Sequence, residues 1–454
     1  MVKSLSILAP QESIIKHTTS RCTVCLSKAP AKVVRDGKKI LMVRTCPEHG
    51  EQSYVISTDD RFYWLSHGSH TCCAPGQTCN AAESATGVLG RNAQLPSTTP
   101  FESLSTCLAL IEIVDSCNLA CPTCYANSPV GTGSKVAAHS LDSIKERILG
   151  VLSRKGGIEI LQLSGGEPTL HPQFFELIDW IKAEPRIQYL LINTNGVLLA
   201  KDPSFAAELA KRVSYDNLQL YLQFDGTGAE GQRELRGADL RSMKETALER
   251  ARDMKLPVTL AMTVTPDNIS NLWSSISYGL SFSHVRGITF QPVFISGRQP
   301  TDVRRDDSPY SVADILLSAV AQSAGKLKHE DFTPLPCGDP NCATIGYLLK
   351  VDGGIQSISD LINLKSLQGF LADRVRYSLE DLSQCGCESE PLGALLKQCE
   401  LDESHTFRIF VKPFMDARSW DEDRIDRCCT HVIRPDGKLD SFCRYYSGFP
   451  DSRA

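Results

Sequence analysis

The sequence predicts an α/β protein whose main domain is an incomplete (β/α)6 barrel, with a small metal-binding module before it and a cysteine-rich extension after it. Three observations lead to this prediction. Six apolar segments alternate with helical patterns between residues 107 and 293, the 18 cysteines occur in groups, and the 454-residue chain is 42% hydrophobic, which suffices for a large core. Strands that alternate with helices are typical of parallel βαβ units, and a curved set of six such units is an incomplete barrel.

The chain divides into four parts. Residues 1–70 form the expected metal-binding module, 71–106 a cysteine-containing linker, 107–300 the barrel, and 301–454 an extension that we expect to hold an auxiliary metal cluster. The linker assignment rests on the small and polar residues between about 80 and 104, which are typical of loops.

The barrel strands are recognised as short apolar runs. The expected ranges are 107–114, 158–164, 187–195, 217–225, 257–264 and 285–293. A helix is expected after the N-cap candidate Ser140, and Pro172 is expected in the first turn of the following helix. A further helix, over 312–326, is expected to leave the barrel.

The strand at 217–225 alternates apolar and polar side chains. Its apolar members are Leu218, Leu220, Leu222 and Phe224, and its polar members are Gln219, Tyr221, Gln223 and Asp225. In a parallel barrel the apolar set packs under the helices, so the polar set points into a lumen that holds a polar ligand. An exposed edge strand would give the same alternation, but the FDG turn ends this strand where barrel active sites lie, which favours a lumen.

Charge and hydropathy exclude several classes of protein. The formal net charge is −5, and no stripe of Lys and Arg marks a nucleic-acid binder. No signal peptide and no run of 18 apolar residues is present, so we expect a cytoplasmic protein without a transmembrane segment. In the reducing cytosol, grouped cysteines indicate metal ligation or catalysis rather than disulfides.

A CxxxCxxC loop directly follows the first expected strand. Its cysteines are Cys117, Cys121 and Cys124. Three thiolates on one loop can each bind one iron of a 4Fe-4S cluster, which leaves the fourth iron open to a chelating small molecule. A zinc site normally uses four protein ligands, so the odd number of cysteines favours the cluster.

The motif SGGEP, residues 164–168, ends the second expected strand. Its glycines Gly165 and Gly166 allow the backbone to approach a ligand closely, and the Glu167 carboxylate that follows can accept hydrogen bonds from an ammonium group. Such glycines after a strand are also compatible with an ordinary turn.

Together, the cysteine loop and SGGEP resemble the radical S-adenosylmethionine (SAM) superfamily over residues 107–293. The resemblance implies that the cluster cleaves SAM reductively, that a 5'-deoxyadenosyl radical then abstracts hydrogen from an unactivated carbon, and that a donor such as ferredoxin or flavodoxin supplies the electron. The catalytic residues it implies are Cys117, Cys121 and Cys124. The cofactor-binding residues it implies are Tyr125, Ser164, Gly165, Gly166, Glu167, Asn193, Thr194, Asn195, Gln223 and Asp225. The polar residues at the strand ends would serve equally well as caps.

Near the N-terminus, four residues have the spacing of a mononuclear metal site. They are Cys22, Cys25, Cys46 and His49, in CxxC and CxxH form. Two such knuckles suit a tetrahedral ion, and the spacing fits zinc and a rubredoxin-like iron equally. His49 is the least certain ligand, since a later cysteine would serve as well.

A second cysteine group lies in the extension. We expect Cys337, Cys342, Cys443 and one of the adjacent Cys428 and Cys429, with Cys428 preferred, to hold an auxiliary 4Fe-4S cluster. Some of these thiols would otherwise be buried core residues.

A narrower resemblance covers almost the whole chain. The segments PCGDPNC, RGITFQPV, KPFMDA and RCCTHVIRPDGKLDSFCRYY resemble the family of the archaeal tetraether lipid synthases, which includes dihydro-hydroxymethylpterin dimethyltransferases. Members of this family have another cluster before the barrel. Here only Cys72, Cys73 and Cys79 occur in that place, so a fourth ligand would have to come from elsewhere, such as Cys107.

Three functions are compatible with these features. The first is radical carbon–carbon bond formation on lipid alkyl chains, as an oxidoreductase or transferase of lipid biosynthesis. The second is radical methylation of a pterin or other small heterocycle, without a visible cobalamin module. The third, an iron-sulfur electron carrier, would not need SGGEP or an open iron. A long apolar tunnel above the cluster would favour a lipid, and a short polar pocket would favour a heterocycle.

Overall fold

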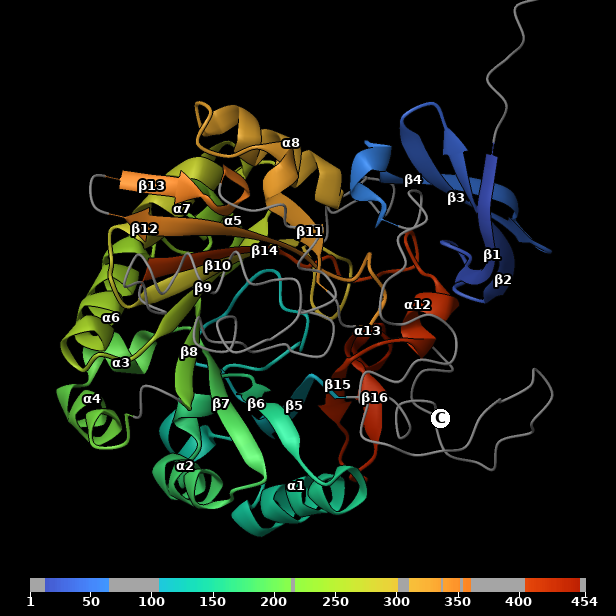
Figure 1. The fold of residues 1–454 in the computed structure, drawn as a ribbon. Coiled ribbons are helices and arrows are strands. Elements are labelled where there is room, and N and C mark those ends of the chain that lie inside the picture. Colours follow the sequence, from blue (N-terminus) through green and yellow to red (C-terminus); the bar gives the residue numbers. More distant parts are fainter. Residues whose placement is uncertain are drawn as a thin grey trace, which may run out of the picture.

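The computed structural model describes residues 13–64, 106–213, 217–300, 310–335, 338–351, 354–360 and 405–449. Figure 1 shows the two sheets of this part of the chain, a small one from the N-terminal module and a large one that forms the main domain. The expectations for Cys72, Cys73, Cys79 and Cys337, and for the linker, fall outside the described residues.

The N-terminal module is an antiparallel four-stranded sheet in the order β1-β2-β3-β4. Its strands are β1 (Ser13–Arg21), β2 (Lys28–Asp36), β3 (Lys39–Cys46) and β4 (Gly50–Ser57). Val33, Ile40 and Met42 are buried on one face of this sheet and form a small separate core. This module packs against the C-terminal helix α12 (Glu422–Asp426), where Lys16 lies 2.7 Å from the Asp421 carboxylate (Figure 1).

The main domain is built on six consecutive parallel strands, as the sequence predicts. They are β5 (Leu108–Val114), β6 (Ile158–Gly165), β7 (Ile187–Thr194), β8 (Leu218–Gln223), β9 (Val258–Val264) and β10 (Val285–Pro292). Each strand pairs with the next one along the chain, so the β/α rhythm of the sequence is also the spatial order. The expected and observed strand ends differ by at most two residues.

Helices cover the outer side of these strands (Figure 1). They are α1 (Leu141–Lys155), α2 (Phe174–Ala183), α3 (Val197–Lys201), α4 (Pro203–Ala210), α5 (Ala229–Arg236), α6 (Arg241–Asp253), α7 (Leu272–Leu280) and α8 (Val312–Gln322). Ser140 caps α1 as expected, since its hydroxyl accepts a hydrogen bond from the Ser143 N–H. The prediction that Pro172 lies in the first turn of α2 is wrong. Pro172 lies in the turn before this helix, which begins at Phe174.

The extension contributes strands to both edges of the parallel set, which the sequence did not reveal. β14 (Thr406–Val411) pairs in parallel with β10, and β15 (Thr430–Ile433) pairs in parallel with β5. The remaining strands are β11 (Phe332–Pro334), β12 (Thr344–Val351), β13 (Gly354–Ser357) and β16 (Leu439–Ser441), and α13 (Phe442–Tyr446) follows. In the part of the chain that the structure describes, the strand order runs from β11 to β16 without joining its ends, so the barrel is open.

The two faces of β8 confirm the predicted lumen. Leu218, Leu220 and Leu222 are buried in the core that the strands share with the helices. Gln219 and Tyr221 line a cavity on the opposite face. The alternation therefore reflects a strand between a core and a lumen rather than an exposed edge.

Among the described residues, no helix is both long and apolar enough to cross a membrane.

Candidate active site

The cysteine loop after β5 is held at both ends by backbone hydrogen bonds. The Cys117 N–H donates to the Pro129 carbonyl at 2.9 Å, and the Gly131 N–H donates back to the Cys117 carbonyl at 2.9 Å. Cys124 and Arg298 exchange two such bonds, at 2.9 and 2.8 Å. The loop is thus fixed between its own return segment and the segment that follows β10.

The three loop cysteines fit an iron-sulfur cluster. Cys117, Cys121 and Cys124 are not joined by disulfides and all line one cavity beside the glycines of SGGEP. Burial, and then the nearby charges of Glu167, Cys121 and Cys124, raise the pKa of Cys117 to about 12. Three thiolates so close together in a buried place need a cation between them, which a cluster provides.

Both glycines of SGGEP lie so close to the backbone of residues 114–116 that a side chain would not fit. Gly165 has a φ of +117°, and a Cβ on it would overlap the Val114 carbonyl oxygen. A Cβ on Gly166 would overlap the Ser116 carbonyl, one residue before the first loop cysteine. The Gly166 N–H also donates to the Val114 carbonyl at 2.8 Å, so the strand end is pressed against the start of the cysteine loop.

The Glu167 carboxylate is occupied by protein donors. It is 1% exposed and accepts hydrogen bonds from the hydroxyls of Thr169 and Thr194, both at 2.6 Å, and from the Asn195 N–H at 2.8 Å. These bonds link the ends of β6 and β7, and the contact of this carboxylate with an ammonium group stays a prediction. The glycines, which do line the cavity, remain available to a ligand.

Other expected cofactor residues divide into a cavity layer and a supporting layer. Tyr125, Asn193 and Gln223 line the cavity. Ser164 lies behind them, accepting a hydrogen bond from Asn193 Nδ2 at 3.2 Å and lying 3.4 Å from the Tyr125 hydroxyl. Asn195 donates to Asn118 Oδ1 at 2.7 Å and lies 3.7 Å from Cys117 Sγ, so it supports the loop.

Asp225 also belongs to the supporting layer. It is fully buried and binds the guanidinium of Arg236 through two hydrogen bonds of 2.6 and 2.9 Å. Lys244, next to this pair, is buried as well and donates to the Asn195 carbonyl at 2.6 Å. Burial lowers the pKa of Lys244 to about 8, although the charge of Asp225 opposes this effect. Asp225 thus pairs with Arg236 and is not among the residues that line the cavity.

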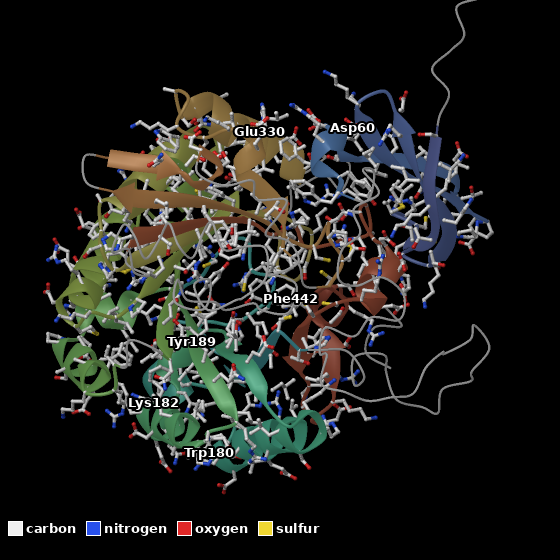
Figure 2. All side chains as sticks on the ribbon, viewed as in Figure 1. Asp60, Trp180, Lys182, Tyr189, Glu330 and Phe442 are labelled. Carbon is white, nitrogen blue, oxygen red and sulfur yellow. The ribbon has the colours of Figure 1, made fainter. Side chains whose placement is uncertain are left out.

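The cavity has a volume of about 310 Å³ and extends along the strands. Its lining reaches from Gly166, at the carboxyl end of β6, to Ile160 and Arg286, near the amino ends of β6 and β10. Figure 2 shows two of its lining residues, Tyr189 and Phe442, in the middle of the molecule. The polar lining residues from the strands include Gln162, Tyr189, Asn193, Gln219, Tyr221, Gln223, Thr259, Thr263, Thr289 and Gln291.

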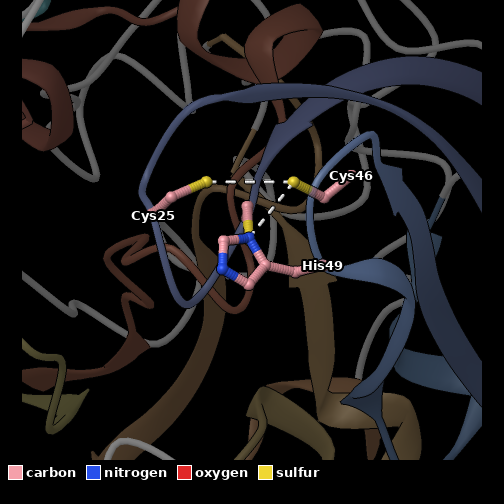
Figure 3. Close-up of side chains that lie close together, drawn as sticks. Cys25, Cys46 and His49 are labelled. Atoms are coloured by element: carbon pink, nitrogen blue, oxygen red, sulfur yellow. Dashed lines mark hydrogen bonds between the residues drawn. The ribbon is translucent and has the colours of Figure 1, made fainter.

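The N-terminal metal site has the geometry that its spacing predicts. One ligand atom from each of Cys22, Cys25, Cys46 and His49 lies within 4.8 Å of the others (Figure 3). Cys25 Sγ is 3.8 Å from Cys46 Sγ, and His49 Nδ1 is 3.6 Å from the sulfurs of both Cys22 and Cys46. His49 therefore completes the four-ligand set.

The described cysteines of the extension also gather in one place. Burial, and then the neighbouring thiols of Cys429, Cys342 and Cys443, raise the pKa of Cys428 well above its usual value. Arg424 donates toward Cys342 Sγ at 3.7 Å, and the Met415 N–H donates to Cys443 Sγ at 3.4 Å. Donors of this kind are typical of the surroundings of cluster thiolates.

Sequence reasoning missed the role of the cations around the loop. Arg298 donates to the carbonyls of Cys121 and Ser128, at 2.9 and 3.1 Å. Arg236 Nη1 lies 3.9 Å from Cys121 Sγ, and Lys244 donates to the Asn195 carbonyl at 2.6 Å. No local motif marks these residues, because their partners are far away in the sequence.

Two family models match parts of the chain. Residues 14–58 match the HMPTM N-terminal zinc ribbon domain, and residues 111–278 match the radical SAM superfamily. The first range contains all four N-terminal metal ligands, and the second contains both the cysteine loop and SGGEP.

The chain is also similar to several known proteins. The chain is 24% identical to 7,8-dihydro-6-hydroxymethylpterin dimethyltransferase of Methanocaldococcus jannaschii, over 95% of this chain and 93% of the relative. It is 28% identical to the mycofactocin maturase of Mycobacterium ulcerans, over 36% of this chain and 41% of that protein. Similar solved structures include methylornithine synthase (TM-score 0.37, 18% identity, 49% and 64% of the two chains) and Streptococcus suis SuiB bound to S-adenosylmethionine (TM-score 0.35, 14% identity, 46% and 44%).

Proposed function

We propose that this chain, a radical SAM enzyme, transfers a methyl group by radical chemistry from a one-carbon donor of the folate class to a pterin or another small polar heterocycle. The observation that carries the proposal is the set of hydrogen-bonding strand side chains that lie among the apolar lining residues of the lumen. The radical SAM superfamily implies a 4Fe-4S cluster and SAM as cofactors. When bound, they supply a 5'-deoxyadenosyl radical that abstracts hydrogen from the substrate.

The amide side chains of the lumen are held in place by hydrogen bonds to neighbouring hydroxyl groups. The Tyr189 hydroxyl donates to Gln219 Oε1 at 2.8 Å, and Gln219 Nε2 donates to Thr259. Gln291 Nε2 donates to the Tyr221 hydroxyl at 2.7 Å. Side chains fixed in this way present their remaining donors and acceptors in defined directions, as recognition of a heterocycle edge requires.

Aromatic rings also line the same cavity. Phe414 lies 4.3 Å from Phe442 and 5.3 Å from Phe294 between ring centroids, and Tyr125 lies 5.6 Å from Phe442. Flat aromatic faces suit a flat substrate ring. Together with the amides they support a heterocycle that is stacked at its face and hydrogen-bonded at its edge.

A long alkyl chain would gain less from this lumen. Each buried methylene contributes about 0.8 kcal/mol only where it replaces water by apolar contact. Against Gln162, Gln219 and Gln291 it would instead deprive amide groups of hydrogen-bonding partners, which is costly. Radical carbon–carbon bond formation on lipid chains is therefore the less favoured proposal, and the experiment below distinguishes the two.

The substrate is tested by following deuterium into 5'-deoxyadenosine during anaerobic incubation with a deuterated pterin or, separately, with a deuterated phospholipid. We expect label from the pterin, and we expect Gln219→Leu to reduce this transfer about tenfold or more, since one lost buried hydrogen bond costs about 1–3 kcal/mol. Gln173→Leu, an exposed position before α2, is the matched control and should leave the transfer unchanged. Label that arrives only from the phospholipid would contradict the proposal.

We also propose an auxiliary 4Fe-4S cluster in the extension, held by Cys337, Cys342, Cys443 and one of Cys428 and Cys429. The support is the gathering of the described thiols with Arg424 beside them. A donor of the ferredoxin or flavodoxin class is the proposed external source of electrons. The N-terminal ligand set takes zinc in this proposal, in line with the zinc ribbon match.

The auxiliary cluster predicts that iron and sulfide persist when the loop cluster is removed. In a variant with Cys117, Cys121 and Cys124 all replaced by alanine, we expect about one 4Fe-4S cluster per chain, because the proposed auxiliary ligands belong to the extension and not to the loop after β5. Iron and acid-labile sulfide analysis measures this, with circular dichroism to establish that the variant is folded. A folded variant without iron-sulfur absorbance would refute the auxiliary site.

A further inference from the structure

Arg236 brings a fixed positive charge to one sulfur of the cysteine loop. Arg236 is the last residue of α5, and its Nη1 lies 3.9 Å from Cys121 Sγ. Its side chain is 11% exposed, so water screens this charge little. An arginine guanidinium does not lose its proton in proteins, so it is a permanent cation here.

Asp225 fixes the direction of this guanidinium. It holds Arg236 Nε and Nη2 through its two carboxylate oxygens, which leaves Nη1 directed at Cys121. Asp225 is itself fixed, because it is fully buried, has a φ of +61°, and accepts a hydrogen bond from the Thr263 N–H at 3.2 Å. A bidentate pair of this kind leaves the guanidinium little freedom to turn away.

The backbone of Cys121 is also fixed by hydrogen bonding. Arg298 Nε donates to the Cys121 carbonyl at 2.9 Å. Gly237, next to Arg236, has a φ of +75° and ends α5 where a Cβ would contact the Pro122 ring. The distance between guanidinium and sulfur is thus determined by two rigid segments rather than by one flexible side chain.

We propose that Arg236, held by Asp225, is a positioning residue that raises the reduction potential of the cluster on Cys117, Cys121 and Cys124. A reduced cluster carries one more negative charge than an oxidised one. A guanidinium that donates toward a thiolate ligand stabilises the reduced form more, so electron entry becomes easier. The proposal rests on the loop cluster of the proposed function and is independent of which substrate is used.

The test is a redox titration of the reconstituted protein, followed by electron paramagnetic resonance. The signal that changes when SAM is added identifies the loop cluster, so an auxiliary cluster does not interfere. Arg236→Gln combined with Asp225→Asn removes both charges and keeps an amide pair in place of the ion pair. We expect this double variant to have a midpoint potential more negative than that of the wild type. We expect a smaller shift in the same direction for Arg236→Lys, which keeps the positive charge but cannot bind the Asp225 carboxylate through two nitrogens.

Arg233→Gln is the matched control. Arg233 lies on the same helix, but its side chain is 60% exposed and it lies 3.9 Å from Glu230. Its charge is screened, so the midpoint potential should not move. An unchanged potential in the double variant, with full iron content, would overturn the proposal. Loss of the cluster from both Arg236 variants would overturn it too, because Arg236 would then be a structural support of the loop. Failure of the pterin labelling would leave these outcomes unaffected.

Discussion

Replacing any one of Cys117, Cys121 and Cys124 with alanine is expected to abolish the release of 5'-deoxyadenosine. Each thiol lines the same cavity beside Gly165 and Gly166, and two remaining thiolates cannot hold a cubane with a single open iron. Since enzymes typically accelerate reactions by at least about 10⁶-fold, the rate should fall to the uncatalysed background. The measurement is chromatographic detection of 5'-deoxyadenosine after anaerobic reconstitution and reduction with dithionite.

The matched control for these variants is Val130→Ala. Val130 lies on the same segment between β5 and α1, is 59% exposed, and pairs with Cys117 only through an isolated backbone bridge. This variant should release 5'-deoxyadenosine at the wild-type rate. Undiminished release of 5'-deoxyadenosine from any of the three cysteine variants would contradict the assignment of these cysteines as cluster ligands.

The features that the sequence predicts correctly are local ones. The CxxxCxxC and CxxC spacings are determined within one loop or one pair of knuckles, so Cys22, Cys25, Cys46 and His49 converge as expected. The strands of the barrel are equally local, because each is marked by its own buried apolar side chains, which in β8 occur at every second position. The alternation in β8 predicted which of its faces meets the cavity, because the side chains of a strand have a period of two.

The features that the sequence does not reveal depend on contacts between distant segments. The Glu167 carboxylate accepts hydrogen bonds from the hydroxyl of Thr194 and the N–H of Asn195, both at the end of another strand. The pairing of Asp225 with Arg236 was not predicted either. The parallel pairing of β15 with β5 joins residues more than 300 positions apart, and no turn or periodicity marks it.

The second large effect is expected from Gly166→Ala. A Cβ at this position would overlap the Ser116 carbonyl, and its neighbour Glu167 donates its N–H to the same carbonyl at 2.9 Å. Because the obstacle is backbone, the strand end and the cysteine loop must separate. Overpacking of this kind costs about 1–3 kcal/mol of stability, and a shift of about 1 Å near reacting groups costs about 10²-fold in rate. We expect release of 5'-deoxyadenosine to fall by at least that factor and the melting temperature to drop.

Gly150→Ala provides the comparison that makes the Gly166 result specific. Gly150 lies within α1, where a Cβ would meet only the guanidinium end of Arg154, a flexible side chain that can move. Alanine in a helix interior is more favourable than glycine by about 0.5–1 kcal/mol, so this variant should be as stable as the wild type or more stable, with full activity. The two variants add the same methyl group, and they differ in whether it meets backbone or a movable side chain. If Gly166→Ala kept the wild-type rate and melting temperature, the close approach of SGGEP to the cysteine loop would not be required for the reaction.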